Sequence, residues 1–423
     1  MRTPLSRRLV VATVAVVTTA AVVAGAGPAI SAEPVAAPVT KPIQYADQPT
    51  AIAGSYIVVL KPGIKNEDTS QVANTLAGRY GGSVRFVYDA NGFGFAIDTS
   101  ADSASRIAGD PLVDYVAQDQ EVTLDYFVQP APPSWGIDRI DEHSLPLDNK
   151  YHYPNTAPSV NAYIIDTGIL LNHVEFGGRA ACGFDPFATG CAPCNQGHGT
   201  HVAGTVGGVT TGVAKAVRLI SVKVFNCAPS TTWALVIAGV NYVTLSAPLT
   251  PGLDVANMSL SGGAFAPADA AVLNSIATAN VHYSLAAGNS NADACLFSPA
   301  RIGGAGLGCP GAAGHTGTTV GATTITDNRA GFSNFGVGLD FFAPGNAIFS
   351  AWYTAPNAYA NLSGTSMAAP HSTGTAALWR QRFPADTAVG VKNALANNAT
   401  PGVVIGPGPG SPNLLLFSNA IPM

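Results

Sequence analysis

The chain has 423 residues, of which 47% are hydrophobic and only 11% are charged, against about 25% charged residues in a typical soluble protein. The apolar content suffices for a large core, and the length allows two or three domains. The net charge is −5, and the absence of a basic block or an acidic tail argues against a nucleic-acid partner. The 46 glycines and 31 prolines alternate with long apolar runs, which indicates tight turns rather than disorder.

The N-terminus has the composition of a secretory signal peptide. Three arginines precede an apolar run from Leu9 to Ala26, and small residues up to Ala32 suit cleavage. A membrane anchor is the alternative, because the run is long enough to span a bilayer, but the first charge after it is the acidic Glu33. Residues 1–32 are therefore expected to be a removed signal peptide, and the mature protein is expected to be secreted, extracellular and not membrane-bound.

Six cysteines, none before residue 182, indicate disulfide bonds in an exported chain. Their number alone allows fifteen different pairings. They are Cys182, Cys191, Cys194, Cys227, Cys295 and Cys309. A zinc site is the alternative, because two of these cysteines lie close in sequence to His198 and His201, although their spacing is poor for zinc.

A segment at about residues 52–124 has its own pattern of short strands and helices. Its apolar periodicity predicts the order strand, helix, strand, strand, helix, strand, which is a split βαβ sandwich of the α+β class. The predicted elements are Tyr56–Leu60, Asp68–Tyr80, Ser83–Tyr88, Gly94–Asp98, Ala101–Ala108 and Val113–Ala117. The segment contains no histidine, and its scattered carboxylates do not indicate catalysis.

After Leu124, a proline-rich joint at Gln129–Pro133 precedes a segment in which strands and helices alternate. This alternation predicts an α/β fold with a mainly parallel sheet flanked by helices. The predicted strands are Ser159–Ile165, Val217–Val224, Val255–Leu260, Val281–Ala286, Thr318–Ala322 and Leu339–Ala343. The predicted helices are His198–Val206, Thr232–Tyr242, Pro267–Ala279 and Ser366–Arg382.

Three polar residues stand where this class of fold keeps its active sites. Asp166 ends a strand, His198 opens a helix between two glycines, and Ser366 opens another helix shortly after Gly364. Taken singly, each has a structural alternative: a turn aspartate, a surface histidine or an N-capping serine. Pro370 is expected in the first turn of the serine's helix, where a missing N–H costs little.

Together these residues supply the groups needed for acyl transfer. Ser366 would attack as the nucleophile, His198 would take and return its proton, and Asp166 would hold the imidazole tautomer. Asn289, which by itself suits a turn, would stabilise the oxyanion together with the backbone N–H of the serine. His201, one turn further along its helix, is expected to support the site. The order Asp, His, Ser along the chain is that of subtilisin.

The motifs around these residues resemble the three signatures of the subtilisin-like serine proteases, the subtilases. They read Asp166-Thr-Gly, His198-Gly-Thr-His-Val-Ala-Gly and Gly364-Thr-Ser-Met-Ala-Ala-Pro-His371. The similarity extends from Trp135 to Ser418 and is greatest to the proteinase K branch and its aqualysin-like members. The resemblance implies a secreted serine endopeptidase with a subtilisin-like fold.

The segment before the joint resembles the inhibitor-type prodomain of the same family. Such a prodomain assists folding as an intramolecular chaperone, inhibits the active site and is then cut off by the enzyme itself. The resemblance implies a signal peptide at 1–32, a propeptide at 33–125 and a peptidase domain at 126–423. It also implies protein and peptide substrates and a monomeric enzyme.

The resemblance further assigns two strands that flank the primary specificity pocket. They comprise Ser259, Leu260, Ser261, Ala286, Ala287 and Gly288. Ser261 stands where relatives usually have glycine, which would crowd the edge of the pocket. Pro229 removes an N–H from the other strand that pairs with substrate. The implied specificity is broad and favours apolar or aromatic residues before the cleaved bond.

One or two structural calcium ions are implied by the same resemblance. Four carboxylates resemble the calcium loop of the aqualysin-type proteases, namely those of Asp138, Asp141, Glu142 and Asp148. The alternative interpretation of this cluster is a solvated acidic helix start. A second site, similar to one in proteinase K, would use Asp340 with the carbonyls of His315 and Gly317.

The resemblance also narrows the disulfide pairing. The implied pairs are Cys194–Cys227, Cys295–Cys309 and Cys182–Cys191. The first is similar to an aqualysin-type disulfide. The second contains half of another such bond, whose usual partner position falls near Gly338, and the third consists of the two cysteines left over.

Three other functions remain open at this point. An esterase would use the same triad, and a comparison of ester and peptide turnover would distinguish it. A pseudoprotease would bind peptides without cleaving them, although the intact triad argues against this function. The prodomain could itself be a secreted inhibitor if it survived maturation.

Overall fold

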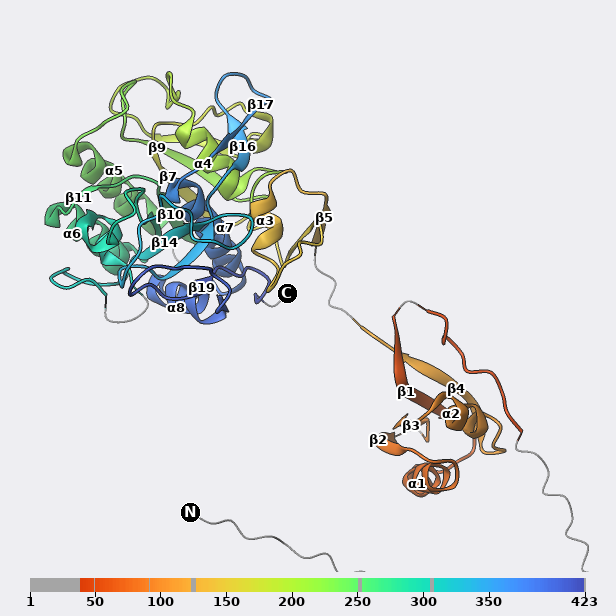
Figure 1. Cartoon of the computed structure of the whole chain (residues 1–423). Helices are drawn as coiled ribbons and strands as arrows, with labels where there is room; N and C mark the ends of the chain where they lie inside the picture. The colour runs from red at the N-terminus through yellow and green to blue at the C-terminus, as the bar shows by residue number, and fades with distance from the viewer. Residues whose placement is uncertain are drawn as a thin grey trace, which may run out of the picture. The chain divides into compact units, whose positions relative to one another are not determined.

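The computed structural model describes residues 39–48, 50–90, 92–122, 127–249, 253–304 and 308–421. These residues fall into two compact units, one before and one after the segment 123–126 (Figure 1). The predicted signal peptide at residues 1–32 lies outside the described residues. Among the helices that are described, none has the length and apolar character needed to cross a membrane.

The N-terminal unit is a four-stranded antiparallel sheet packed with two helices around one apolar core. Its elements are β1 Ala51–Leu60, η1 Asn66–Asp68, α1 Thr69–Tyr80, β2 Ser83–Tyr88, β3 Gly94–Asp98, α2 Ala101–Ala108 and β4 Val113–Gln120. The strand order is β2-β3-β1-β4. Val58, Phe95, Ile107 and Val116 are fully buried in the core, which joins both helices to the sheet. The predicted βαββαβ sandwich is confirmed.

The C-terminal unit is built on a sheet that has nine strands in the described part of the chain. They are β7 Asn161–Asp166, β8 Ala180–Phe184, β9 Arg218–Lys223, β10 Asp254–Met258, β12 His282–Ala286, β14 Thr318–Thr323, β15 Phe341–Pro344, β18 Thr400–Pro401 and β19 Leu414–Leu415. The order is β18-β19-β15-β14-β12-β10-β7-β9-β8, and every pair is parallel except β18–β19. The mainly parallel sheet predicted from alternation is confirmed.

Helices cover both faces of this sheet. They are α3 Trp135–Arg139, α4 His198–Gly207, α5 Trp233–Ser246, α6 Ala266–Ala279, α7 Thr365–Arg382 and α8 Ala388–Asn398. Along β7, Ala162 and Ile164 pack with α4 and α7 in one core, whereas Tyr163 and Ile165 pack with α5 and α6 in another. Figure 1 shows α5 and α6 together on one side of the unit. A parallel strand that is buried on both faces must be apolar at every position, which explains the continuous apolar runs in the sequence.

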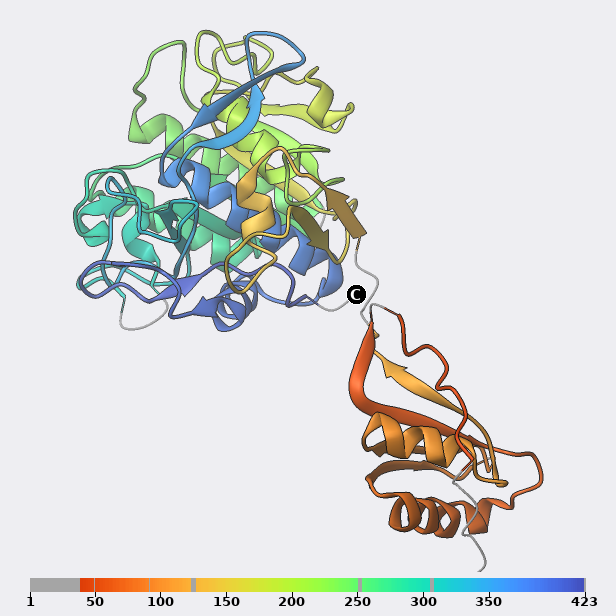
Figure 2. The same cartoon turned by 45° about the vertical axis from the view of Figure 1, so that its right-hand side comes forward.

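Several short elements were not expected from the sequence. They are η2 Val174–Phe176, η3 Ala247–Leu249, β11 Gly262–Gly263, η4 Ala294–Leu296, β13 Phe297–Ser298, η5 Ala300–Ile302, β16 Ile348–Trp352 and β17 Ala358–Leu362, besides β8, α3, α8, β18 and β19. Figure 2 shows the hairpin β16–β17 beside α4, with which it is in contact. Most of these elements are too short for hydrophobic periodicity to reveal them.

The proline-rich joint proved partly structured, and this corrects the prediction for it. Phe127–Pro130 forms β5, which pairs antiparallel with β6, Lys150–Tyr153. The ring of Phe127 stacks on Tyr153 with centroids 5.5 Å apart, and Gln129 Nε2 donates to the carbonyl of Thr210 at 2.9 Å. Contacts with residues that are distant in sequence therefore fix Phe127–Pro130, although the proline-rich composition of the joint indicates a linker.

The fold brings the candidate residues to one edge of the sheet. Because parallel strands end on the same side, the last residues of β7, β10 and β12 and the loops that follow them lie along one line. The N-termini of α4 and α7 lie at the same edge, because His198 contacts Asp166 at the end of β7 and Ser366 contacts Ser259 just after β10. Helix N-termini carry free N–H groups and the positive end of the dipole, which favour developing negative charge.

A buried ion pair fixes α3 to the rest of the unit. Arg139 is fully buried, and its Nε and Nη2 donate to the two carboxylate oxygens of Asp327 at 2.8 and 3.0 Å. We expect Asp327→Asn to leave the guanidinium without a counter-charge and to cost about 3–5 kcal/mol of unfolding free energy. Urea unfolding would measure the loss. The double variant Arg139→Met with Asp327→Asn should recover much of it, because it removes the buried charge and keeps a residue that tolerates the left-handed backbone at position 327, where φ is 59°. An equal loss in both variants would contradict the charge argument.

Candidate active site

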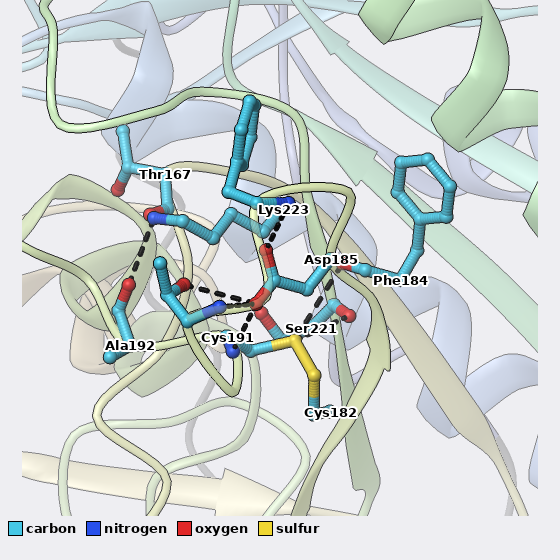
Figure 3. Close-up of a disulfide and its surroundings, with 10 residues drawn as sticks. Thr167, Cys182, Phe184, Asp185, Cys191, Ala192, Ser221 and Lys223 are labelled. Atoms are coloured by element: carbon cyan, nitrogen blue, oxygen red, sulfur yellow. Dashed lines mark hydrogen bonds between the residues drawn. A yellow bond between two sulfur atoms is a disulfide. The ribbon is translucent and has the colours of Figure 1, made fainter.

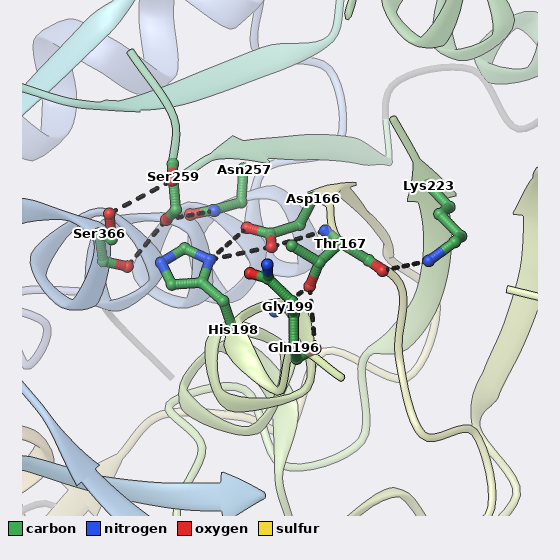
Figure 4. A network of polar contacts seen from close by, with 9 residues as sticks. All are labelled: Asp166, Thr167, Gln196, His198, Gly199, Lys223, Asn257, Ser259 and Ser366. Atoms are coloured by element: carbon green, nitrogen blue, oxygen red, sulfur yellow. Dashed lines mark hydrogen bonds and ion pairs between the residues drawn. The ribbon is translucent and has the colours of Figure 1, made fainter. Parts of the chain in front are cut away.

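Asp166 and His198 form the best-defined contact of the site. Asp166 is the last residue of β7 and is buried, and His198 is the first residue of α4. The imidazole Nδ1 lies 2.9 Å from Oδ1 and 3.0 Å from Oδ2 of the carboxylate (Figure 4). A Cβ atom on Gly199 would lie 2.4 Å from the carbonyl oxygen of Gly168, so only glycine allows α4 to start this close to β7.

The pKa of the His198 imidazole is set by its burial and by the neighbouring carboxylate of Asp166. Burial by itself lowers the pKa of His198, but the negative charge of Asp166 and its hydrogen bond raise it, and the net shift is upward. The carboxylate thus stabilises the imidazolium that forms when His198 accepts a proton. This is the electrostatic arrangement of a general base.

Ser366 is the second residue of α7 and lies close to the imidazole. In Figure 4 the ring of His198 lies between Ser366 and Asp166. The hydroxyl Oγ of Ser366 donates to the carbonyl oxygen of Ser259 at 3.2 Å. The hydroxyl of Ser259 in turn donates to the carbonyl of Ser366 at 2.8 Å and accepts from Asn257 Nδ2 at 2.8 Å. The segment after β10 therefore fixes the first turn of α7 through two reciprocal bonds.

Pro370 corrects one prediction and explains one of these bonds. The helix begins at Thr365, so the proline lies in its interior rather than in its first turn. A proline has no N–H, and the carbonyl four residues earlier, that of Ser366, loses its helical donor. Ser259 Oγ supplies the missing donor. The proline is tolerated because a neighbouring strand satisfies the free carbonyl.

Asn289 is held in one orientation by Thr365. Its Oδ1 accepts from the backbone N–H of Thr365 at 2.8 Å and from the hydroxyl of Thr365 at 2.9 Å. The hydroxyl also accepts from the N–H of Gly288 at 3.0 Å. With Oδ1 engaged, Nδ2 is the donor that remains, beside the free N–H groups at the start of α7. Sequence reasoning missed Thr365, although it adjoins the candidate serine.

A cleft of about 440 Å³ is lined by His198, Ser366 and Asn289 and by most of the predicted substrate strands, whereas Asp166 is buried and does not line it. The strand residues in its wall are Ser259, Leu260, Ser261, Ala286 and Gly288. Ala287 does not line the cleft; it is fully buried, and its carbonyl accepts from Asn334 at 2.8 Å. Trp233, which the sequence did not single out, lines the cleft and stacks on Phe265 with centroids 5.8 Å apart.

His201 lies outside the cleft, as expected of a supporting residue. It is fully buried, and its Nε2 lies 2.9 Å from the carbonyl of Ile348 and 3.1 Å from that of Ala360. Burial lowers its pKa to about 4, so it stays neutral at physiological pH. It ties α4 to the hairpin β16–β17.

Lys223 is a further residue behind the site that the sequence did not reveal. It ends β9 and is fully buried, and its Nζ donates to the carbonyls of Thr167 at 2.6 Å and Ala192 at 2.8 Å (Figures 3 and 4). The hydroxyl of Thr167 accepts from the N–H of Gly199 at 3.0 Å. The ammonium therefore holds the turn that follows Asp166. The only indication of its role in the sequence is that it is a single lysine at the end of an apolar run.

The three disulfides agree with the pairing implied by the resemblance. They are Cys182–Cys191, Cys194–Cys227 and Cys295–Cys309, and they include all six cysteines. The zinc alternative is excluded because its cysteine ligands are in disulfides with different partners. Figure 3 shows the first bond beside Asp185, whose carboxylate accepts from the N–H groups of Phe187, Thr189 and Cys191. This loop leads to the helix of His198.

Three of the four predicted calcium ligands converge. Carboxylate oxygens of Asp138, Glu142 and Asp148 lie within 4.8 Å of one another, whereas Asp141 is bound to His152 through Oδ2, 3.0 Å from Nδ1. Within the described residues, Asp138 Oδ1 and Glu142 Oε2 are buried without a hydrogen-bond partner. Burial and mutual repulsion raise the pKa of Asp138 to about 6 and of Glu142 to about 7. Buried oxygens without donors suit a hard cation.

The predicted second calcium site has a different occupant. Lys392 Nζ lies 3.3 Å from Asp340 Oδ1 and donates to the carbonyl of His315, which are two of the three groups expected to bind the ion. It also donates to the carbonyl of Gly304 at 3.1 Å. These residues do not fit a metal ion, because an ammonium stands between the expected ligands.

Comparison with known proteins places the chain in a family. The model of the subtilase family matches residues 163–414, which is more than half of the chain and contains all three candidate residues. This chain belongs to the subtilase family. The model of the peptidase inhibitor I9 family matches residues 55–125, so the N-terminal unit of this subtilase is an inhibitor-type prodomain.

Two curated relatives and one solved structure are similar over long stretches. An extracellular serine proteinase of Thermus sp. (strain Rt41A) is 45% identical over 91% of this chain and 94% of the relative. Alkaline serine exoprotease A of Vibrio alginolyticus is 42% identical over 92% of this chain and 72% of the relative. The crystal structure of a cold adapted subtilisin-like serine proteinase has a TM-score of 0.61 and 45% identity over 67% of this chain and 97% of that chain. This subtilase is a serine endopeptidase.

Replacement of Lys223 tests its place behind the site. Lys223→Met leaves the buried carbonyls of Thr167 and Ala192 without a donor, and each costs about 1–3 kcal/mol of stability. It also removes a positive charge that interacts with Asp166. The His198 imidazolium is then favoured, so its pKa rises, and the acidic limb of kcat/KM against pH is expected to move to higher pH.

The pH profile and thermal unfolding of the two variants would be measured together. Lys215→Met is the matched control, because this lysine is also buried but contacts Gln129 and the carbonyl of Thr210. The control should lose stability while its acidic limb stays in place. An unchanged limb in Lys223→Met would contradict the electrostatic role.

Proposed function

We propose that this subtilase is a secreted endopeptidase, made as a self-cleaving zymogen, that cleaves proteins with the triad Asp166, His198 and Ser366. The observation that carries the proposal is the pair of short contacts between His198 Nδ1 and the Asp166 carboxylate, beside the cleft that His198 and Ser366 line. The free N–H at the start of α7 and Asn289 Nδ2 are the donors available to an oxyanion.

The reaction follows from these positions. Ser366 Oγ transfers its proton to His198 Nε2 and attacks the carbonyl carbon of the bound peptide bond. The oxygen of that carbonyl becomes an oxyanion, which accepts from the Ser366 backbone N–H and from Asn289 Nδ2. His198 then gives the proton to the leaving amine, and water removes the acyl group by the same steps in reverse order. In the resting enzyme Ser366 Oγ donates to the Ser259 carbonyl, so this bond must open when substrate binds.

The walls of the cleft support a broad preference for apolar or aromatic residues before the cleaved bond. Leu260 and Ala286 contribute apolar surface, and Trp233 adds an aromatic side chain that stacks on the ring of Phe265 behind it. Ser261 keeps a hydroxyl near Gly288, since a Cβ built on that glycine would lie 3.7 Å from Ser261 Oγ. A polar group at this edge narrows the pocket without closing it.

The prodomain would act as an intramolecular chaperone and inhibitor before its removal near Leu124. Its compact core supports folding as a unit, and its family match supports inhibition. Residues 1–32 would direct export, in keeping with the extracellular relative from Thermus. We propose that the mature enzyme, residues 126–423, works as a monomer outside the cell.

Intact mass of the secreted protein over time tests the proposal. The wild type is expected to lose its prodomain near residue 124, whereas Ser366→Ala keeps it covalently attached because the nucleophile is gone. Ser363→Ala is the matched control, since this serine lies just before α7 and its hydroxyl accepts from Asn346 Nδ2 and from the N–H of Ala347 in the turn before β16. The control should process like the wild type.

The other outcomes separate the alternative functions. If the wild type and Ser366→Ala both stay full length, the protein is a peptide-binding pseudoprotease. If both are cut alike, another protease does the processing, and activity must be measured on a peptide substrate. Faster turnover of esters with no peptide cleavage would identify an esterase.

We also propose that Asp138, Glu142 and Asp148 hold one structural calcium ion, with Asp141 fixing the loop through His152. The support is the convergence of three carboxylates and their buried oxygens without donors. When bound, the ion would neutralise the crowded carboxylates and so stabilise the loop between α3 and β6. It lies outside the set of residues that line the catalytic cleft.

Chelation tests this site. Removal of calcium is expected to lower the unfolding temperature of the wild type, because a ligand at about a hundred times its Kd stabilises by roughly 2.7 kcal/mol. Asp138→Asn should reduce the response to added calcium. Asp269→Asn, which removes another buried carboxylate near Arg301, should keep the full response. Equal responses in the two variants would place the ion elsewhere.

A further inference from the structure

Lys392 on α8 is a buried cation in a place where three segments of the peptidase unit meet. Its side chain is 5% exposed, and its Nζ lies 3.3 Å from Asp340 Oδ1. The same Nζ donates to the carbonyl of Gly304 at 3.1 Å and to that of His315. An ammonium has three N–H groups and no acceptor. Two carbonyls accept hydrogen bonds from it here, and the carboxylate pairs with its charge.

Asp340 is equally committed to its present partners. It is fully buried, and its Oδ2 accepts from the N–H groups of Gly304 at 3.0 Å and Thr319 at 2.7 Å. Its Oδ1 accepts no hydrogen bond from the described residues and is held by the charge of Lys392, whose Nζ is 3.3 Å away. The carboxylate therefore connects α8, the start of β14 and the segment after η5 through one ion pair and two backbone bonds.

A calcium ion does not fit this arrangement. Calcium needs roughly six to eight oxygen ligands at about 2.3–2.6 Å. The oxygens of Asp340 and His315, which would be two of them, already contact a positively charged nitrogen. A divalent cation there would face the ammonium at close range without a second carboxylate, since none contacts this group within the described residues. One carboxylate is neutralised by one ammonium.

We propose that Lys392 replaces a calcium ion with a built-in cation, so that this part of the fold is held together without metal, and that removal of the lysine side chain opens a calcium site at Asp340. The vacated space would expose Asp340 Oδ1 and the carbonyls of Gly304 and His315, and water would complete the shell. This inference goes beyond the proposed function, since it concerns neither the triad nor the acidic loop near α3.

The calcium content of the enzyme shows whether Lys392 or a calcium ion neutralises Asp340. Mature enzyme, inactivated with a sulfonyl fluoride, would be equilibrated with a defined concentration of free calcium, and bound metal per chain would be counted by mass spectrometry. Lys392→Ala is expected to bind one more calcium than the wild type. The double variant Lys392→Ala with Asp340→Asn should return to the wild-type count. Lys215→Ala, which removes a buried lysine held by Gln129 and Thr210, should not change it.

Two results would overturn the proposal. One is an equal calcium count in Lys392→Ala and the wild type. The other is a lower count in Asp340→Asn, made in the wild-type background, because it would mean that the carboxylate already holds an ion beside the lysine.

Hydrogen exchange of the unmutated enzyme provides a measurement that does not depend on any variant folding. Peptides containing the amides of Gly304 and Thr319, which donate to Asp340, are expected to exchange equally with and without chelator, relative to β7. The amides of Asp148 and His152 in the acidic loop are the internal comparison. Faster exchange at Gly304 and Thr319 after chelation would show that a metal, not Lys392, holds this segment.

Discussion

The contact between Asp166 and His198 is the interaction on which the site depends, and most of the surrounding structure serves to keep it. A buried carboxylate is costly unless it is paired and hydrogen-bonded. Here it receives the imidazole and the N–H of Thr167 at 2.7 Å, and the turn that carries it is anchored by Lys223. Gly199 allows α4 to begin against this turn. The geometry of the proposed catalytic pair is thus set by the sheet edge together with the turn after β7 and the start of α4.

Helix α7, which carries the proposed nucleophile Ser366, is attached to the same edge in a complementary way. Pro370 leaves the Ser366 carbonyl without its helical donor, and Ser259 donates to it from the end of β10. Thr365 binds Asn289 from the end of β12. The segments after β10 and β12 therefore both fix the first turn of α7, so the proposed nucleophile and the proposed oxyanion donor are positioned together.

Buried cations recur in a chain with only 11% charged residues. Arg139 pairs with Asp327, Lys223 binds two carbonyls behind the proposed triad, and Lys392 joins α8 to Asp340. Each connects segments that are distant in sequence. A buried charge is tolerated only when fixed acceptors surround it. Separation of those segments would leave the charge buried without its partners, which costs free energy. These few buried cations therefore help to fix the loops around the sheet in one arrangement.

The sequence by itself determined the family and the class of fold, and it supplied the residues of the proposed triad. The motifs at Asp166, His198 and Ser366 are local and specific, and the apolar runs of β7, β10 and β12 are long enough for their pattern to be read. The order of the prodomain elements followed from the same periodicity. Even the disulfide pairs agreed with what the resemblance implied, because cysteines leave few alternatives once one pair is known.

The tertiary structure alone decided which polar groups meet. Phe127–Pro130 became a strand because Tyr153 and Thr210 lie beside it, and Ala287 turned out to be buried behind the cleft rather than in it. Nothing near Lys392 in the sequence indicates that it would occupy the place expected for an ion at Asp340. The physical reason is common to these cases. Local patterns report hydrophobic burial, whereas the partner of a buried polar group is chosen by segments that only the folded chain brings together.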